Sequence, residues 1–170
     1  VFSFPMKHRI DCCGFLFEEK ARKPKITKAS IARYELIPSQ IIQLKNGNAV
    51  TLQNGETLDA SVVCEDPEPP KTYAYCSDTA YSEKVIDAIM GCTTVYHEST
   101  FLESETERAK STFHSTAKQA ATVAKRVGAK RLILGHFSSR YAGDENFKIE
   151  AETIFPEAYL ANEGNVYTIH

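Results

Sequence analysis

The pattern of apolar and polar residues divides the chain into three stretches. The first contains two short apolar runs, at residues 1–7 and 13–18, which predict two strands joined by a polar turn at 8–11. From residue 72 onward, strand-like and helix-like runs alternate, and this alternation is typical of α/β layered folds. The stretch between them follows neither rhythm.

The alternating stretch predicts a series of elements. Strands are expected at residues 73–77, 93–96, 131–134, 157–161 and 165–169, and helices at 82–90, 116–127 and 144–153. The helix at 116–127 has the best-defined ends, because Thr116 and Gln119 match a capping box and Gly128 is a typical C-terminal stop. The sequence therefore predicts an α/β fold.

The middle stretch, residues 20–70, is interpreted as an inserted arm. Lysines and arginines cluster at 20–33, prolines interrupt the stretch, and two Asn-Gly pairs mark turns. A small hairpin is expected near residues 48–58. The basic cluster could contact nucleic-acid phosphates, although such a run is more often a solvated loop.

Composition narrows the classes of protein that fit. The 170 residues are 42% hydrophobic and 25% charged, which predicts one globular domain. A net charge of −2 argues against nucleic-acid binding by overall basicity, and leaves a local basic patch open. The five cysteines are odd in number and form no C-x-x-C pair, so we expect them to be reduced and mostly buried in a cytoplasmic protein, with Cys12 and Cys13 as a buried strand pair.

The start of the chain carries an expectation of its own. It opens at Val1, directly inside a strand-like run, and we expect that upstream sequence has been left out. Neither an apolar run of about 20 residues nor a charged-then-apolar leader is present, so nothing indicates a membrane span or a signal peptide. The terminal His170 has no motif around it and is given no role.

Four polar groups stand where an apolar run stops. They are His8, Asp78, the pair His97-Glu98, and His136. Because the carboxyl ends of strands line the ligand crevice in layered α/β folds, these side chains are expected to converge. Histidine and aspartate are ligands that Zn²⁺ accepts, and three protein ligands leave a position open for water. Taken singly, a histidine at a strand end is more often a structural or surface residue.

A second candidate segment precedes the best-defined helix. His114, Ser115 and Thr116 lie at its start, where free backbone N–H groups favour a phosphate. The plainer alternative is that one hydroxyl caps the helix and that His114 belongs to an exposed loop.

A third candidate segment follows His136. Ser138, Arg140 and Tyr141 offer a guanidinium and an aromatic ring, which suit phosphate contact and base stacking. A strand-end loop without a ligand is the alternative interpretation.

Four segments together resemble, in order and spacing, the later motifs of ribonuclease Z in the metallo-β-lactamase superfamily. They are Cys76-Ser77-Asp78-Thr79, His97-Glu98-Ser99-Thr100-Phe101, His114-Ser115-Thr116-Ala117-x-Gln119-Ala120-Ala121 and Gly135-His136-Phe137-Ser138-Ser139-Arg140-Tyr141, with His8 upstream in the matching context. The resemblance covers nearly the whole chain, and residues 20–70 match only loosely.

The resemblance implies a fold and a cofactor. The fold is the C-terminal half of an αββα sandwich, a mixed sheet with helices on its outer face, with residues 1–170 as a single half domain and the arm inserted at about 20–70. Two zinc ions are implied per intact active site, with Asp78 bridging them and His8 and His136 each binding one. The family's other ligands come from an H-x-H-x-D-H motif that this sequence lacks. We therefore expect an incomplete metal centre in this chain alone.

The resemblance also implies an activity. It is the removal of the 3′ trailer from precursor tRNA by phosphodiester hydrolysis, which leaves a 3′-hydroxyl. His114, oriented by Glu98, is implied as the general acid. The residues implied to hold the acceptor end of the tRNA are Ser115, Thr116, Ser138, Arg140 and Tyr141. A cytoplasmic homodimer is implied, with the arm of one subunit gripping the tRNA bound by the other.

Two other functions stay open. A superfamily relative acting on small phosphodiesters or sulfate esters would use the same metal chemistry. The isolated chain, in contrast, could be a non-catalytic binding or dimerisation module.

Overall fold

The computed structural model describes residues 1–169, so that His170 lies outside the described range. The chain forms two compact units. The larger unit consists of residues 1–19 and of the chain from Lys71 onward, and the smaller unit consists of residues 20–70. Each unit is described by itself below.

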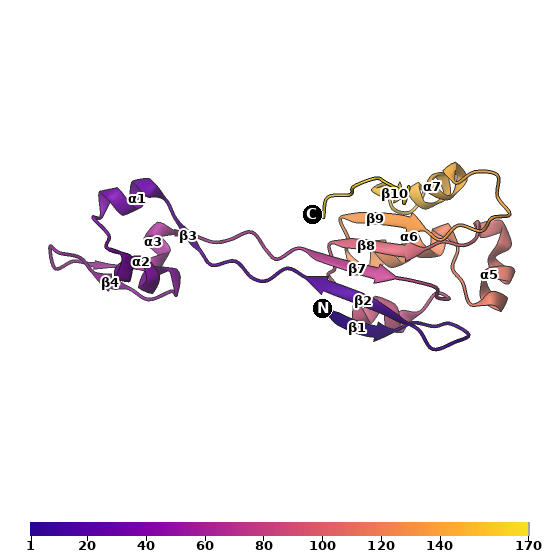
Figure 1. The fold of residues 1–170 in the computed structure, drawn as a ribbon, viewed down its shortest axis with the longest axis horizontal. Coiled ribbons are helices and arrows are strands. Elements are labelled where there is room, and N and C mark those ends of the chain that lie inside the picture. Colours follow the sequence, from indigo (N-terminus) through magenta and orange to yellow (C-terminus); the bar gives the residue numbers. More distant parts are fainter. Residues whose placement is uncertain (170) are drawn as a thin grey trace. The chain divides into compact units, whose positions relative to one another are not determined.

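A six-stranded sheet forms the centre of the larger unit (Figure 1). Its strands, in spatial order, are β1 (Phe2–Pro5), β2 (Cys13–Glu18), β7 (Thr72–Cys76), β8 (Thr94–Glu98), β9 (Arg131–Gly135) and β10 (Ala158–Leu160). Strand β2 is antiparallel to both neighbours, whereas β7 to β10 are parallel to one another. The sheet is therefore mixed, and the carboxyl ends of β1, β7, β8 and β9 lie at the same end of it.

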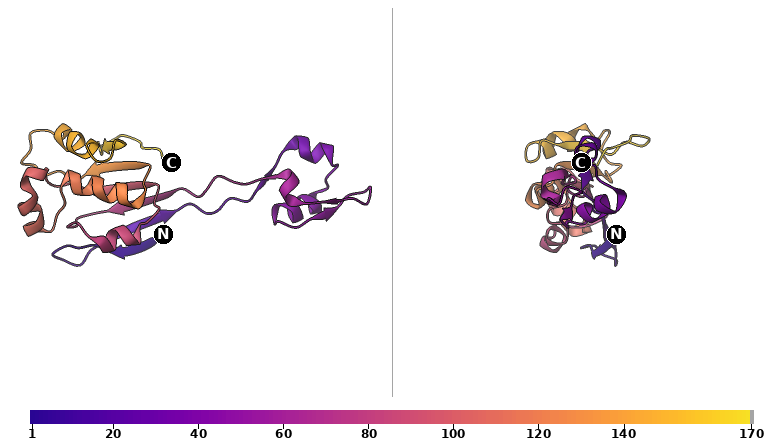
Figure 2. Two further views of the ribbon diagram at one scale, coloured as in Figure 1. Left: turned by 180° about the vertical axis from the view of Figure 1, so that it is seen from behind. Right: turned by 90° about the vertical axis from the view of Figure 1, so that its left-hand side faces the viewer.

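Helices cover one face of this sheet. The helical elements of the larger unit are α4 (Glu83–Ala88), the 3-10 helix η1 (Glu103–Glu105), α5 (Thr106–Thr112), α6 (Ala117–Val127) and α7 (Glu145–Glu152). Figure 2, left, shows helices in front of the sheet, and α6 packs against β8, β9, α4 and α7. Because strand side chains alternate between faces, Ala74, Val95 and Leu132 point together into this core and are fully buried.

The opposite face of the sheet carries aromatic side chains. The strand register places Phe15, Tyr75 and Tyr96 in one row across β2, β7 and β8. The rings of Tyr75 and Tyr96 stack with their centroids 4.8 Å apart, and Phe15 and Phe17 are exposed. In a β-sandwich, the inner face of each sheet packs against the other sheet. With helices on one face of its sheet and apolar side chains on the other, this unit has the layers of one half of such a sandwich.

Residues 20–70 form a small unit with its own core. Its elements are β3 (Lys25–Ile26), α1 (Lys28–Arg33), α2 (Pro38–Lys45), β4 (Val50–Thr51), β5 (Thr57–Leu58), α3 (Ala60–Val63) and β6 (Cys64–Glu65). The core consists of Leu36, Leu44, Val50, Leu58, Ala60 and Val63. The sequence pattern did not indicate the helices, because helices this short depend on tertiary packing more than on their own periodicity.

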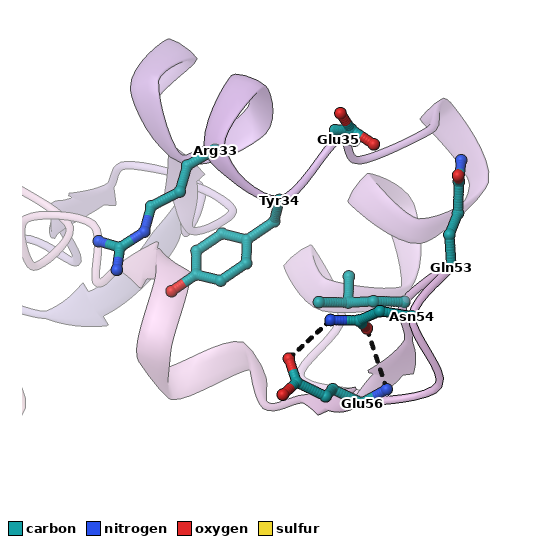
Figure 3. A pocket seen from close by; sticks show the side chains of 7 residues that line it. Arg33, Tyr34, Glu35, Gln53, Asn54 and Glu56 are labelled. Atoms are coloured by element: carbon teal, nitrogen blue, oxygen red, sulfur yellow. Dashed lines mark hydrogen bonds between the residues drawn. The ribbon is translucent and has the colours of Figure 1, made fainter.

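A pocket of about 320 Å³ lies beside the β4–β5 turn of the small unit (Figure 3). Arg33 and Tyr34, at the end of α1, line one side of it, and Asn54 and Glu56 line the other. Asn54 organises the turn, because its Oδ1 accepts from Glu56 N at 3.1 Å and its Nδ2 donates to Glu56 Oε2 at 2.8 Å. These bonds add to the backbone hydrogen bonds of the turn, from Leu52 N to Glu56 O at 2.8 Å and from Gly55 N to Leu52 O at 3.0 Å.

The expected strand at residues 165–169 is wrong. Those residues have no strand assignment, and side chains bind their backbone instead. Arg131 donates to Thr168 O, and Lys71 Nζ donates to Ile169 O at 2.9 Å. Tyr167 in turn donates its hydroxyl to Leu160 O. The alternating apolar residues therefore do not form a strand here. Hydrogen bonds from the side chains of Arg131 and Lys71 hold the backbone of this segment instead.

The expectation for the cysteines is wrong in part. All five are free, but only Cys76 and Cys92 are buried. Cys13 is exposed because it shares the aromatic face with Phe15, two residues further along β2, and not the helix-covered face. Among the described residues, no helix combines the length and apolarity that crossing a bilayer requires.

The capping box of α6 provides a test of the fold. Thr116 Oγ1 accepts from Gln119 N at 3.2 Å and donates to Glu103 Oε2 at 2.8 Å. We predict that Thr116→Ala lowers the free energy of unfolding by about 1–2 kcal/mol, the usual cost of a lost N-cap. Urea denaturation of the 170-residue chain measures this loss.

Thr122→Ala is the matched control for that measurement. Its hydroxyl bonds only to Lys118 O within the same helix, so its loss should change the stability by no more than about 0.5 kcal/mol. Equal losses for the two variants would contradict the capping role of Thr116.

Candidate functional site

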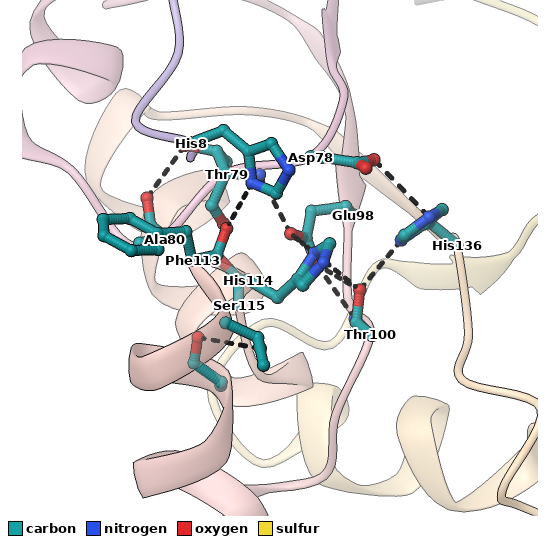
Figure 4. Close-up of polar contacts among 12 residues, drawn as sticks. His8, Asp78, Thr79, Ala80, Glu98, Thr100, Phe113, His114, Ser115 and His136 are labelled. Carbon is teal, nitrogen blue, oxygen red and sulfur yellow. Dashed lines mark hydrogen bonds and ion pairs between the residues drawn. The ribbon is translucent and has the colours of Figure 1, made fainter. Parts of the chain in front are cut away.

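Side chains from the ends of three strands meet at one end of the sheet (Figure 4). His8 follows β1, Asp78 follows β7 and His136 follows β9. His136 Nε2 lies 3.5 Å from Asp78 Oδ1. The ring of His114 lies between the other two imidazoles, with centroid distances of 5.1 Å to His8 and 5.3 Å to His136. The convergence expected from the strand ends is therefore present in the structure.

Glu98, the last residue of β8, lies beneath this cluster and has no exposed surface. Its Oε1 accepts from Thr79 N at 2.9 Å and from His114 Nδ1 at 2.7 Å. Its Oε2 accepts from the backbone N and the hydroxyl of Thr100, at 3.0 and 2.8 Å. Burial is the largest single influence and raises the pKa of Glu98, but the hydrogen bonds from His114, Thr79 and Thr100 together outweigh it and lower the pKa. Glu98 is a buried carboxylate anion.

His114 is held by this anion. The hydrogen bond from its Nδ1 to Glu98 raises the pKa of His114, and this effect exceeds the opposing effect of burial. The side chain is 16% exposed, so the ring still reaches solvent. Glu98 therefore favours the protonated form of His114 and fixes the orientation of its ring.

Two residues at the site have left-handed backbone conformations. Phe113, which ends α5, has φ 60°, and His136 has φ 59°. Such a conformation is costly for residues other than glycine and is found at the ends of helices and at functional sites. At Phe113 it accompanies a contact of the backbone, because Phe113 O accepts from His8 Nδ1 at 2.9 Å.

The donor set fits a divalent metal ion. The ligand atoms of His8, Asp78 and His114 lie within 4.8 Å of one another, and a second group of Glu98, His114 and His136 meets the same limit. In the second group, however, Glu98 already accepts four hydrogen bonds and has no free lone pair directed outward. The group formed by His8, Asp78 and His114 therefore has the freer donor atoms, and His136 adjoins it, with its Nε2 3.5 Å from Asp78 Oδ1. Imidazole nitrogen and carboxylate oxygen are ligands for such ions.

His97 does not join the site. It is fully buried, its Nδ1 lies 2.6 Å from Glu98 O, and burial lowers its pKa. Strand β8 extends through Glu98, beyond the expected end at Tyr96. Adjacent residues in a strand face opposite ways, so only Glu98 of the pair reaches the cluster.

Ser115 and Thr116 lie beside His114 but are fully buried. Ser115 donates its hydroxyl to Thr79 O at 2.6 Å, and Thr116 caps α6. Both hydroxyls thus bind within the protein, and their role as substrate contacts stays a prediction.

In the loop after His136, Ser138 and Tyr141 bind within the protein, whereas Arg140 faces solvent. Ser138 donates its backbone N–H to Thr100 O at 3.1 Å. Tyr141 Oη accepts from Leu102 N at 3.2 Å, and its ring packs edge-on against Phe147. Arg140 is exposed. The guanidinium is therefore better placed than the tyrosine ring to meet a ligand from solvent.

A pocket of about 210 Å³ adjoins His114. It is lined by Lys7, Ala80, Tyr81, Thr106, Lys110, His114 and Gln119. The two lysines, which come from the end of β1 and from α5, place positive charge beside the imidazole. No sequence pattern indicates this pairing, because the two lysines stand in unrelated segments about 100 residues apart.

Comparison with known proteins agrees with this geometry. A family model described as a beta-lactamase superfamily domain matches residues 25–137, which is more than half of the chain. This chain belongs to the beta-lactamase superfamily. It is 43% identical over 164 residues to ribonuclease Z of Parabacteroides distasonis, covering 96% of this chain and 54% of that protein. It is 44% identical over 171 residues to ribonuclease Z of Cytophaga hutchinsonii, covering 99% and 54%. The chain thus spans about half the length of the curated relatives it matches.

Solved structures show the same fold. The metallo-beta-lactamase fold protein YhfI of Bacillus subtilis is 18% identical with a TM-score of 0.61, over 97% of this chain and 47% of that one. The short form of human tRNase Z is 21% identical with a TM-score of 0.54, over 99% and 42%. The resemblance to ribonuclease Z and the predicted half of a metallo-β-lactamase sandwich are both confirmed.

Two contacts of the site were missed by the sequence interpretation. Thr100 lies within a quoted motif but was given no role, although it stands two residues after Glu98, where a hydroxyl can return to the carboxylate. Phe113 contributes a backbone carbonyl in a left-handed conformation. Phenylalanine has no preference for the left-handed region, so the sequence does not predict this conformation.

The pair of His114 and Glu98 makes stability depend on pH. The lowered pKa of Glu98 contributes stability that is present above its ordinary value of 4.5 and is lost as the pH falls through the folded value. The raised pKa of His114 contributes stability that is full below 6.5 and is lost as the pH rises through the folded value. In metal-free protein, His114→Ala should therefore lower the free energy of unfolding most between these two values, by about 1.5–3 kcal/mol.

Urea denaturation of both proteins across this range checks the prediction. Arg126→Ala, which removes an exposed ion pair with Glu83, is the control and should show a small loss without this pH profile. A loss for His114→Ala that does not vary with pH would contradict the charged hydrogen bond.

Proposed function

We propose that this chain forms part of a zinc-dependent endoribonuclease that removes the 3′ trailer from precursor tRNA and leaves a 3′-hydroxyl. The observation that carries the proposal is the pairing of His114 with buried Glu98, directly beside the rings of His8 and His136 and close to Asp78. This arrangement offers an oriented proton donor next to a set of metal ligands. Relatives that share about 40% of its residues are named ribonuclease Z.

The metal role is assigned to three side chains. Asp78, His8 and His136 would hold the zinc ions. When bound, such ions lower the pKa of water and stabilise negative charge on a phosphoryl group. Their further ligands would come from an H-x-H-x-D-H motif, which these 170 residues do not contain. By itself, the chain is expected to be inactive.

His114 is assigned the role of general acid. Its Nδ1 is committed to Glu98, so its proton for transfer resides on Nε2. The raised pKa favours the protonated ring, and the departing 3′ oxygen would receive that proton. A protonated imidazole cannot ligate a metal, which supports a proton-transfer role for His114 over the ligand role that its position alone would allow.

Substrate binding is assigned to the positive groups around the cluster. Arg140 and the pocket lysines, Lys7 and Lys110, suit the phosphates of an acceptor end. Ser138 and Tyr141 would border that surface. The buried hydroxyls of Ser115 and Thr116 would support it from beneath, through their bonds to Thr79 O and to the start of α6. The smaller unit, residues 20–70, would contact the tRNA from the partner subunit of a cytoplasmic homodimer.

A chimera tests these assignments. In it, this chain replaces the matching segment, 54% of the length, of Parabacteroides distasonis ribonuclease Z. We predict that the chimera binds zinc and cleaves precursor tRNA. His114→Ala should lower the cleavage rate by about 10²–10⁴-fold while the zinc content is unchanged. Asp78→Ala should lose both zinc and cleavage, because a metal ligand is removed.

Cleavage assays and metal analysis on the same preparations measure these outcomes. Asp87→Ala, an exposed aspartate in α4, is the control for Asp78→Ala and should retain zinc and activity. Full activity of His114→Ala would remove the general-acid assignment. Turnover of bis(p-nitrophenyl) phosphate without any cleavage of precursor tRNA would favour a phosphodiesterase of small esters instead.

A further inference from the structure

We propose that Thr100 is a positioning residue that connects Glu98 to His136 by two hydrogen bonds and thereby fixes the tautomer of the His136 imidazole. In this tautomer Nδ1 carries the hydrogen, and Nε2, which lies 3.5 Å from Asp78 Oδ1, has a lone pair available for a metal ion. The proposal deepens the proposed function, on which the metal-ligand role of His136 rests. It assigns a task to a side chain that touches neither the predicted metal nor the substrate.

The argument begins with the single hydroxyl proton of Thr100. Thr100 Oγ1 lies 2.8 Å from Glu98 Oε2, and this carboxylate oxygen can only accept a hydrogen bond. The proton of Thr100 is therefore directed to Glu98. Thr100 Oγ1 also lies 2.8 Å from His136 Nδ1. Because its own proton is already committed, the hydroxyl oxygen can only accept there, and His136 Nδ1 must donate.

His114 does not compete for this acceptor. Its Nδ1 lies 3.2 Å from Thr100 Oγ1 but only 2.7 Å from Glu98 Oε1, which is charged and is the stronger acceptor. Glu98 thus orients two imidazoles, His114 directly and His136 through Thr100. With His8 Nδ1 bonded to Phe113 O, each of the three rings has an internal partner at Nδ1.

Burial and backbone contacts support a positioning role. Thr100 is only 7% exposed, whereas the His136 side chain is 46% exposed, so a fixed group holds a ring that borders solvent. Thr100 O also accepts from Ser138 N at 3.1 Å, which ties down the chain just after His136. An outer hydrogen bond of this kind sets the tautomer of a metal-binding histidine and raises its affinity for the ion.

The tautomer can be read directly by ¹⁵N NMR of the histidine rings in the metal-free 170-residue chain. At about pH 8, above the ordinary histidine pKa of about 6.5, the wild-type spectrum should show His136 with hydrogen on Nδ1. Thr100→Ser keeps the hydroxyl and should give the same result. Thr100→Val keeps the shape but removes the hydroxyl, and should yield mixed or reversed tautomers.

Thr94→Val is the matched control. Thr94 is a fully buried threonine in β8, and its hydroxyl has no hydrogen-bond partner among the described residues. This variant should leave the His136 signals unchanged. The His8 signals should be the same in every variant. A wild-type His136 with hydrogen on Nε2 would overturn the proposal even if Thr100→Val failed to fold. An unchanged tautomer in folded Thr100→Val would overturn it as well.

Zinc affinity separates this proposal from the proposed function. Titration of the chimera with zinc, in competition with a chelator, should show about 10–100-fold weaker binding for Thr100→Val, and Thr100→Ser should restore the affinity. A changed tautomer with unchanged zinc affinity would overturn the ligand role of His136 and leave the tautomer assignment standing. Equal zinc affinities together with an unchanged tautomer would overturn the positioning role itself.

Discussion

The buried carboxylate of Glu98 is the interaction on which the candidate site depends. A charge without solvent is very costly unless hydrogen bonds surround it, and Glu98 accepts four. These bonds come from Thr79, Thr100 and His114, which belong to the loops after β7, after β8 and before α6. One side chain thereby holds together three segments that are far apart in the sequence. The ordered approach of those loops is a condition for burying the charge.

The same carboxylate determines how charge is distributed between the buried and the exposed parts of the site. It raises the pKa of His114 through a direct hydrogen bond, which favours the protonated form of this ring. Around it, Asp78 and His136 remain partly exposed, with 38% and 46% of their side chains accessible. The buried layer is therefore fixed and charged, and the layer above it is open to ligands. This division of roles is common in sites where an inner hydrogen-bond network orients the groups that bind or react.

The sheet explains why these loops meet. Strands β7, β8 and β9 are parallel, and β1 is brought into the same direction by the antiparallel β2 between them. Their carboxyl ends therefore lie together, while α4, α6 and α7 cover one face and the aromatic row of Phe15, Tyr75 and Tyr96 occupies the other. A sheet with one helical layer and one apolar face is half of an αββα sandwich, in keeping with a chain that covers 54% of its relatives.

The sequence by itself determined what local patterns encode. The alternation of strands and helices, the ends of α6 from Thr116 to Gly128, and the placing of His8, Asp78 and His136 after apolar runs all follow from side-chain periodicity and capping chemistry. Only the tertiary structure decided what depends on partners elsewhere in the chain. His97 points into the core, and the hydroxyls of Ser115 and Thr116 form hydrogen bonds within the protein. Side-chain contacts replace the expected strand at 165–169. Thr100 lies between Glu98 and His136. The reason is that a hydrogen bond or a buried charge is defined by two groups, and the sequence near one of them carries no record of the other.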